Sequence, residues 1–153
     1  MRTTFFSGNI EKQTLNNNNY RKVIFTSPNG TSQLVLMSLK PKEAIGLEKH
    51  DKVDQFIRIE EGSGDAFIGP EKNNLTHVKL ESGSGLLIPA NNWHNIINSD
   101  ANNYMKLYTI YTPKEHEDLL VQHTKPTEQD GGDDNFYYKY IKYKQKYHDC
   151  KMK

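Results

Sequence analysis

Short apolar runs rich in β-branched and aromatic residues recur through the middle of the chain, and polar turn residues separate them. Glycine, proline, asparagine and serine close the runs at intervals of roughly 8–12 residues, a spacing typical of β-sandwiches and β-barrels. We therefore predict an all-β fold of seven or eight short strands. The expected strands cover residues 23–26, 33–39, 56–61, 65–68, 76–80, 86–89, 95–98 and 106–111.

The chain on either side of this region has a different character. Residues 1–21 are polar, and we expect them to form a leader that adds an edge strand. We assign residues 22–123 to the barrel, within which residues 114–120 form either a short helical turn or a loop over it. Residues 124–135 are rich in proline, glycine and acidic side chains, and this composition predicts a linker.

Residues 136–153 are predicted to form an amphipathic helix. Phe136, Tyr140, Tyr143 and Tyr147 recur at helical spacing and form one stripe, while lysines occupy the remaining surface. Such a basic helix suits contact with nucleic acid, a membrane surface or a partner helix. We favour self-association into a homodimer, or docking on a partner, over nucleic acid. The tail also resembles the Tyr/Lys-rich tails on proteins of large DNA viruses.

Composition excludes several classes of function. The chain carries 20 Lys+Arg and 19 Asp+Glu, so its formal net charge of +1 gives no global field for nucleic acid or membranes. Cys150 is the only cysteine, which excludes an internal disulfide and a zinc site built on several cysteines. A secretory signal and a membrane span of ~20 apolar residues are both absent from the sequence. We expect a soluble intracellular protein, in the host cytoplasm or the virion if it is viral.

Two segments carry residues whose spacing indicates a common site. In the first segment, Glu48 and His50 lie two positions apart, which places them on one face of an extended chain. Gln55 follows His50 by five positions, and Gly62 follows Gln55 by seven. The first segment therefore offers a carboxylate, an imidazole and an amide close to a glycine turn.

The second segment contains a proline turn followed by a histidine. Gly83, Pro89, Asn91, His94 and Asn98 stand in it at fixed intervals. Together the two segments resemble the two motifs of the cupin superfamily in both spacing and order. Asn91 stands where the second motif usually has glycine.

The cupin resemblance covers about residues 22–112 and implies an RmlC-like jelly-roll barrel with a metal site inside it. It implies that Glu48, His50, Gln55 and His94 are the metal ligands. Glu48 takes the place of a histidine, and Gln55 takes the place of a carboxylate. Two imidazoles with two oxygen groups suit a divalent ion such as Mn, Fe, Ni or Zn. Glu48 is also a candidate catalytic general base if it is not a ligand.

Other polar residues leave alternatives open. Asp54 is another source of a carboxylate, but strand alternation places it on the face opposite to Gln55, and we favour Gln55. We expect His77 on a solvent-facing strand edge, and His116 and His123 in a loop or near the mouth of the barrel. A polar pocket without metal, whose groups bond to one another, is the competing interpretation.

Three functions from different classes fit these features. The first is a metal-dependent enzyme acting on a sugar or sugar phosphate, similar to small cupins that resemble mannose-6-phosphate isomerase. The second is a cupin that binds a small molecule or metal without catalysis. The third is a structural or scaffold cupin, viral or otherwise, whose tail mediates association. Fold resemblance alone does not select the reaction, because one barrel hosts many chemistries.

Overall fold

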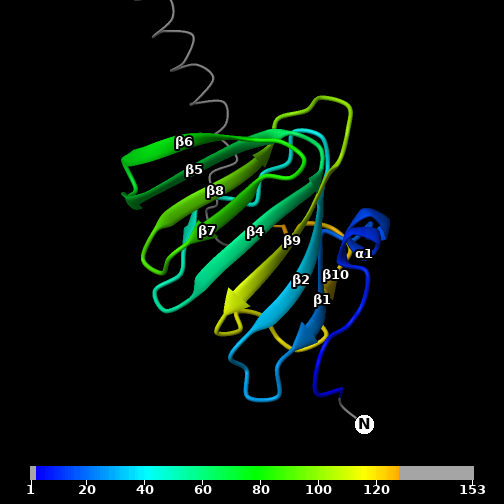
Figure 1. Ribbon diagram of the computed structural model, residues 1–153. Coiled ribbons are helices and arrows are strands. Elements are labelled where there is room, and N and C mark those ends of the chain that lie inside the picture. The colour runs from blue at the N-terminus through cyan, green and yellow to red at the C-terminus, as the bar shows by residue number, and fades with distance from the viewer. Residues whose placement is uncertain (1–2, 128–153) are drawn as a thin grey trace, which may run out of the picture.

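A computed structural model of the chain describes residues 3–127. Within this part, ten strands build two antiparallel sheets, and one short helix lies beside them (Figure 1). No helix among these residues is long and apolar enough to cross a membrane. Most of the predicted linker, and the whole of the predicted helix at 136–153, lie outside the described residues.

Six strands form the larger sheet and four form the smaller one. The order in the larger sheet is β10 (Val121–Gln122), β1 (Arg21–Thr26), β2 (Gln33–Leu39), β9 (Met105–Thr112), β4 (Asp54–Glu61) and β7 (Gly85–Ile88). The order in the smaller sheet is β3 (Glu48–Lys49), β8 (Trp93–Asn98), β5 (Gly64–Glu71) and β6 (Asn74–Leu80). The all-β prediction is confirmed, and the two-residue strands β3 and β10 add to the eight expected from the sequence.

Strand β4 shows how the sequence pattern sets the two faces of the larger sheet. Gln55, Ile57 and Ile59 are buried, whereas Phe56 and Arg58 alternate with them and are partly exposed. Successive side chains on a strand point to opposite faces, so the first set lines the interior of the barrel. Aliphatic side chains from both sheets complete this core, among them Val35, Met37, Leu39, Ala66, Leu80, Ile96 and Leu107.

The N-terminal segment forms a helix, α1 (Ile10–Asn16), and the prediction of an edge strand there was wrong. The side chain of Asn9 caps the helix by accepting a hydrogen bond of 2.9 Å from a backbone N–H of the first turn. The buried ammonium group of Lys106 on β9 donates to the carbonyl oxygen of Asn17, which ties the end of the helix to the barrel. The edge beside β1 is occupied by β10 instead.

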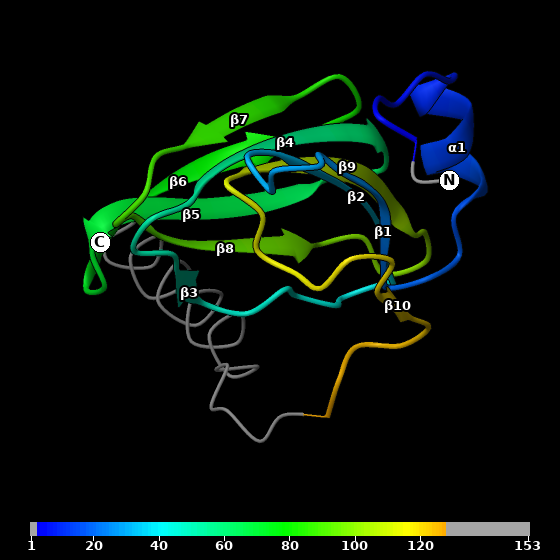
Figure 2. The same cartoon turned by 90° about the horizontal axis from the view of Figure 1, so that it is seen from below.

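Residues 113–120 form a loop, which decides between the two alternatives that the sequence left open. The loop leaves the end of β9 and runs between the two sheets in the view of Figure 2 before it enters β10. Leu120 packs against the core, and its carbonyl oxygen accepts a bond of 2.9 Å from the backbone N–H of Val23. The loop is therefore attached to the core and to β1.

We expect Gly64→Ala to destabilise the fold by about 1–3 kcal/mol or more, the usual range for overpacking. A Cβ atom at Gly64 would overlap the carbonyl oxygen of Ile97 and the terminal methyl group of Met105. Gly85→Ala is the matched control, because its Cβ would lie 3.5 Å from the Phe56 ring, an ordinary contact. Urea denaturation followed by circular dichroism measures the stability of the two variants. Equal unfolding midpoints for Gly64→Ala and Gly85→Ala would contradict the close packing at Gly64.

Candidate metal centre

The pairing of β3 with β8 brings the two sequence motifs together. Glu48 lies directly opposite His94 in the antiparallel ladder, so their side chains share a face. His50 follows Glu48 by two residues, and its carbonyl oxygen accepts a bond of 2.8 Å from the backbone N–H of Asn91. The side chain of His94 is 2% exposed and that of Glu48 is 34% exposed. The cluster is therefore enclosed around His94 and open to solvent at Glu48.

Asn91 shapes the turn that precedes His94. Its φ angle is +66°, in the left-handed region that favours glycine. Asparagine is one of the few other residues that adopt this conformation readily, because its short side chain bonds locally. The asparagine therefore preserves the turn at the motif position where glycine is usual.

The carboxylate of Glu48 faces the Nε2 atoms of two histidines. Its Oε1 lies 3.5 Å from Nε2 of His50 and 3.4 Å from Nε2 of His94, and the three ligand atoms lie within 4.8 Å of one another. These separations are longer than ordinary N–H···O bonds. Ligand atoms at these separations lie within reach of a single ion with bonds of ~2.1 Å. Both Nε2 atoms are buried without a hydrogen-bond partner, so the residues fit a divalent ion between them.

An oxygen atom lies beside the other ring nitrogen of each histidine. Nδ1 of His94 lies 3.0 Å from the carbonyl oxygen of Asn92, and Nδ1 of His50 lies 3.3 Å from Oε1 of Glu115. An acceptor at Nδ1 holds the ring hydrogen there and leaves the Nε2 lone pair free for a metal. Glu115 therefore occupies the position of the carboxylates that commonly orient metal-binding histidines.

Gln55 lies on the opposite sheet. It is 1% exposed, and its Nε2 donates to Oγ1 of Thr109 at 3.0 Å and to the hydroxyl of Tyr111 at 3.2 Å. The ring centroid of Tyr111 in turn lies 6.0 Å from that of His50. The two bonds leave Oε1 of Gln55 buried with no partner, which costs roughly 1–3 kcal/mol when nothing compensates it. Gln55 therefore presents a buried amide oxygen that is free to accept a bond.

The charges of the cluster keep Glu48 ionised. Burial raises the pKa of the Glu48 carboxyl, but the adjacent imidazoles of His50 and His94 outweigh that effect and bring the pKa to about 2. Burial lowers the pKa of His50, but the carboxylates of Glu48 and Glu115 outweigh it, and the pKa is raised. A carboxyl group with so low a pKa is a weak base at neutral pH. The low pKa of Glu48 therefore favours a role as a metal ligand over a role as a general base.

Gln33 on β2 holds the loop that carries Glu115. The Oε1 atom of this buried amide accepts from the backbone N–H groups of Glu115 at 3.2 Å and His116 at 2.9 Å. Its Nε2 donates to the carbonyl oxygen of His116 at 2.8 Å. Three bonds from one side chain fix the loop backbone, so the barrel itself positions Glu115.

His116 brings a further imidazole to this region. Its ring meets the edge of the Tyr111 ring at a centroid distance of 5.1 Å, and its Nε2 is buried without a partner. Burial, and then the positive charge of Arg21, lower the pKa of His116 to about 4. The ring is therefore neutral at physiological pH and can donate one hydrogen bond and accept another.

The other residues considered from the sequence lie outside the cluster. Asp54 is exposed, as strand alternation predicted, and its carboxylate accepts from a backbone N–H at 2.8 Å. His77 lies on β6, 2.5 Å from Asp65, and its side chain is 28% exposed. Nδ1 of His123 lies 2.6 Å from the Asn19 side chain. Among the residues that the two motifs singled out, the structure brings Glu48, His50 and His94 together.

Three residues that contact the motif side chains were not predicted from the sequence. Glu115 and Tyr111 lie beside His50, and Thr109 accepts a hydrogen bond from Gln55. Tyr111 and Thr109 share the inward face of β9, and the two-residue spacing of these polar groups was the available signal. Glu115 lies in a loop with no periodic pattern, so only the folded barrel shows that it reaches His50.

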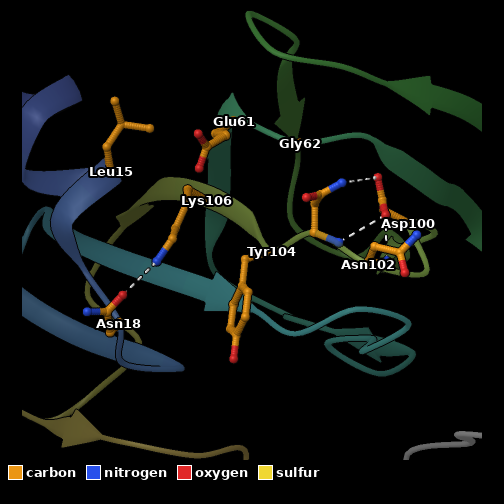
Figure 3. Close-up of a pocket in the computed structure, with 9 residues that line it drawn as sticks. Leu15, Asn18, Glu61, Gly62, Asp100, Asn102, Tyr104 and Lys106 are labelled. Carbon is orange, nitrogen blue, oxygen red and sulfur yellow. Dashed lines mark hydrogen bonds between the residues drawn. The ribbon is translucent and has the colours of Figure 1, made fainter.

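A separate hollow of about 570 Å³ lies at the other end of β9 (Figure 3). Lys106 and Tyr104 line it together with Glu61 and Leu15, and histidine is absent from its described lining. The Lys106 ammonium group is already bonded to Asn18 at 3.1 Å beside α1. The Lys106 ammonium group therefore serves the attachment of the helix.

The stability of the metal-free protein should depend on pH through His116. Its folded pKa of about 4 lies below the ordinary value of 6.5, so the unfolded chain binds more protons between these values, and stability falls as the pH drops through that window. The contribution should be on the order of 1 kcal/mol after solvent screening of the partly exposed ring. Urea denaturation at several pH values should show this slope reduced in His116→Phe and retained in His123→Gln. An unchanged slope in His116→Phe would disprove the assignment.

Comparison with known proteins identifies the family. A family model for the cupin domain matches residues 35–111. The uncharacterized protein L612 of Acanthamoeba polyphaga mimivirus is 48% identical over 143 residues, which cover 91% of this chain and 86% of that protein. The uncharacterized protein YrkC of Bacillus subtilis is 41% identical over 121 residues, or 78% of this chain, and the match spans 63% of YrkC. A viral homologue therefore exists beside a bacterial one.

A solved structure agrees with these sequence relatives. The crystal structure of BH2720 from Bacillus halodurans superimposes with a TM-score of 0.75 and 40% identity, covering 78% of this chain and 89% of that one. A cupin 2 conserved barrel domain protein from Rhodopseudomonas palustris, at 19% identity and a TM-score of 0.52, shows likeness of fold alone. The sequence motifs, the two-sheet barrel and these relatives agree, and the chain belongs to the cupin superfamily.

Proposed function

We propose that this cupin binds a divalent metal ion through Glu48, His50, His94 and Gln55, and that the ion holds a small oxygen-containing molecule in the barrel. The observation that carries the proposal is the set of buried atoms that lack hydrogen-bond partners: Nε2 of both histidines and Oε1 of Gln55. Buried polar atoms in native proteins are nearly always paired, so such a group indicates a ligand. The clustering of the Glu48, His50 and His94 ligand atoms within 4.8 Å supports the same proposal.

The donor set limits the identity of the ion. Two imidazoles, one carboxylate and one amide oxygen suit Mn, Fe, Ni or Zn. Two histidines with one carboxylate also leave open positions on an octahedral ion, where a ligand oxygen can bind. A bound ion would supply a Lewis acid and a template that orients the ligand.

Access and lining support a small molecule as the ligand. The Glu48 side chain is 34% exposed and the Glu115 side chain 31% exposed, so the cluster opens to solvent on that side. Beyond Gln55, the inward face of β4 continues with the apolar residues Ile57 and Ile59. A few directed polar groups among apolar side chains are typical of small-ligand sites.

A structural or scaffold role for the barrel is the alternative function. In this alternative the C-terminal tail mediates association, for example into a homodimer. The tail lies outside residues 3–127, and the described residues do not support this role. The unpaired buried atoms of the cluster count against a purely structural pocket, because each of them costs stability. Sugar or sugar-phosphate binding and isomerase activity stay predictions that no observation here tests.

Protein purified without chelators should contain a divalent transition metal, which elemental analysis by mass spectrometry measures. His94→Ala should lose this metal, because it removes a buried imidazole ligand, and it should abolish the rise in melting temperature on adding the ion. His77→Ala, which changes a histidine outside the cluster, should retain both. A wild-type protein without metal, whose melting temperature is insensitive to Mn, Fe, Ni and Zn, would rule out the proposal.

Gln55→Glu should raise the metal affinity roughly tenfold or more, because a carboxylate is a stronger donor to a divalent ion than an amide oxygen. The hydroxyl groups of Thr109 and Tyr111 can donate to the new carboxylate as they now accept from the amide. Competition with a coloured chelator measures the affinity. Asp54→Asn, on the outward face of the same strand, should leave it unchanged. Equal affinities for Gln55→Glu and the wild type would remove Gln55 from the ligand set.

A further inference from the structure

The outer face of the larger sheet carries apolar side chains where a solvated sheet face normally carries polar ones. On β9, Leu107, Thr109 and Tyr111 are buried inside the barrel, and the residues that alternate with them, Tyr108 and Ile110, are partly exposed. Strand alternation therefore places Ile110 on the outer face. Outward positions of an antiparallel sheet are usually polar, so a group of apolar ones indicates a second contact surface.

Strand register aligns the apolar outward positions of five strands in one line. Phe56 on β4 lies opposite Leu87 on β7 and opposite Ile110 on β9. Ile110 lies opposite Leu34 on β2, and Leu34 lies opposite Phe25 on β1. Together these residues form the outer row, which consists of Leu87, Phe56, Ile110, Leu34 and Phe25. Neighbouring strands are ~4.8 Å apart, so the outer row extends ~19 Å across the sheet.

The outer row is accessible from solvent. Leu87, on the edge strand β7, is 70% exposed, and the other four members are partly exposed. Helix α1 packs near Glu61 and Lys106, at the other end of β4 and β9, and Figure 2 shows it away from β7. The N-terminal segment reaches the β1 end of the row, where the ring centroid of Phe6 lies 6.5 Å from that of Phe25. The described residues thus leave the β7 end of the row open.

Charged side chains on β4 flank the outer row with opposite signs. Asp54 lies two residues before Phe56 and Arg58 lies two residues after it, so all three share the outer face. Asp54 is exposed, and the side chain of Arg58 is 43% exposed. The Nε of Arg58 lies 3.1 Å from Glu60, which leaves further N–H donors of the guanidinium group for another carboxylate. The row therefore has a negative border on one side and a positive border on the other.

This arrangement is complementary to itself under a two-fold rotation. When two copies of the sheet pack face to face about an axis along the outer row, the same surface patch is used on both copies. Phe56 then meets Phe56 of the second copy, and Leu87 meets Leu87. The rotation reverses the strand direction, so Asp54 of each copy meets Arg58 of the other. Such a contact buries apolar surface at its centre and pairs charges at its rim, as stable interfaces do.

We propose that the outer row is the interface of a homodimer, in which two copies of this chain pack face to face about a two-fold axis along the row. Gln55 and Phe56 are neighbours on opposite faces of β4, so the interface lies on the other side of the sheet from the barrel interior. The inference does not rest on metal binding, and the loss of either proposal leaves the other intact.

The charges beside the outer row favour a second copy over the C-terminal segment as its occupant. Residues 136–153 contain six lysines and one acidic residue. On the outer face, Asp54 and Glu60 supply two negative charges, and Arg58 and Lys22 supply two positive ones. Because these charges cancel, the face has no net attraction for a basic segment, whereas it pairs opposite signs with a copy of itself. The C-terminal segment is therefore the competing occupant in the experiment.

The mass of the full-length protein in solution tests the proposal, measured by light scattering after size-exclusion chromatography over a range of concentrations. We expect a dimer. Leu87→Glu should raise the dissociation constant of the dimer roughly tenfold or more, because it buries a carboxylate in the apolar contact. The exposed position keeps the fold intact, which circular dichroism checks. Tyr104→Glu, at a 45% exposed residue outside the row, is the matched control and should leave the dimer unchanged.

An exchange of charges tests the two-fold geometry itself. Asp54→Arg and Arg58→Asp, made singly, each bring like charges together across the interface and should weaken the dimer roughly tenfold or more. The double variant with both changes restores opposite charges and should recover the dimer. A folding defect in the single variants would persist in the double variant, so recovery identifies the contact between Asp54 and Arg58. A double variant that dimerises no better than the single ones overturns this geometry.

Two further outcomes overturn the interface as a whole. The first is a wild-type chain that stays monomeric at the highest soluble concentration. The second concerns the C-terminal segment, whose aromatic stripe is broken by Tyr140→Ser combined with Tyr143→Ser. This variant should remain dimeric. Loss of the dimer in it, with Leu87→Glu still dimeric, would assign association to the C-terminal segment.

Discussion

The cluster of Glu48, His50 and His94 depends on one register, the antiparallel pairing that places Glu48 opposite His94. Strand β3 has only two residues, so the pairing is supported by bonds on either side of it. The backbone N–H of Gly46 donates to the Asn95 side chain at 3.0 Å, and that of Asn91 donates to His50 at 2.8 Å. A slip of one residue would turn every side chain of the segment to the other face and separate the carboxylate from both imidazoles.

A second constraint comes from buried amides on the larger sheet. Gln33 fixes the backbone of the loop that carries Glu115 and His116, and Gln55 binds the hydroxyl groups of β9. Neutral amides can hold a backbone or a hydroxyl in place with a smaller desolvation cost than charged groups. The larger sheet thus holds the loop whose Glu115 lies beside Nδ1 of His50. Nε2 of His50 and of His94 stays free, as metal binding requires.

The sequence predicted most of the strands and the central residues of the cluster. Apolar runs identified eight strands, because alternation and turn residues are local signals. The spacing of Glu48, His50, Gln55 and His94 predicted that they meet, although their role as ligands remains a proposal. The helix α1 was missed because its seven residues depend on the Asn9 cap and on packing against the barrel. The contacts of Glu115 were missed because they join segments far apart in the chain.

By itself, the sequence determined the fold class, the cupin motifs and the face on which Gln55 lies, since all of these follow from periodicity and spacing along the chain. Only the tertiary structure decided which oxygen faces which nitrogen, and which buried atoms lack partners. Strand register decided that Glu48 lies opposite His94, and the crossing of the 113–120 loop decided that His50 has Glu115 beside it. The physical reason is that hydrogen bonds and charges act over a few ångströms in space, whatever the separation in sequence.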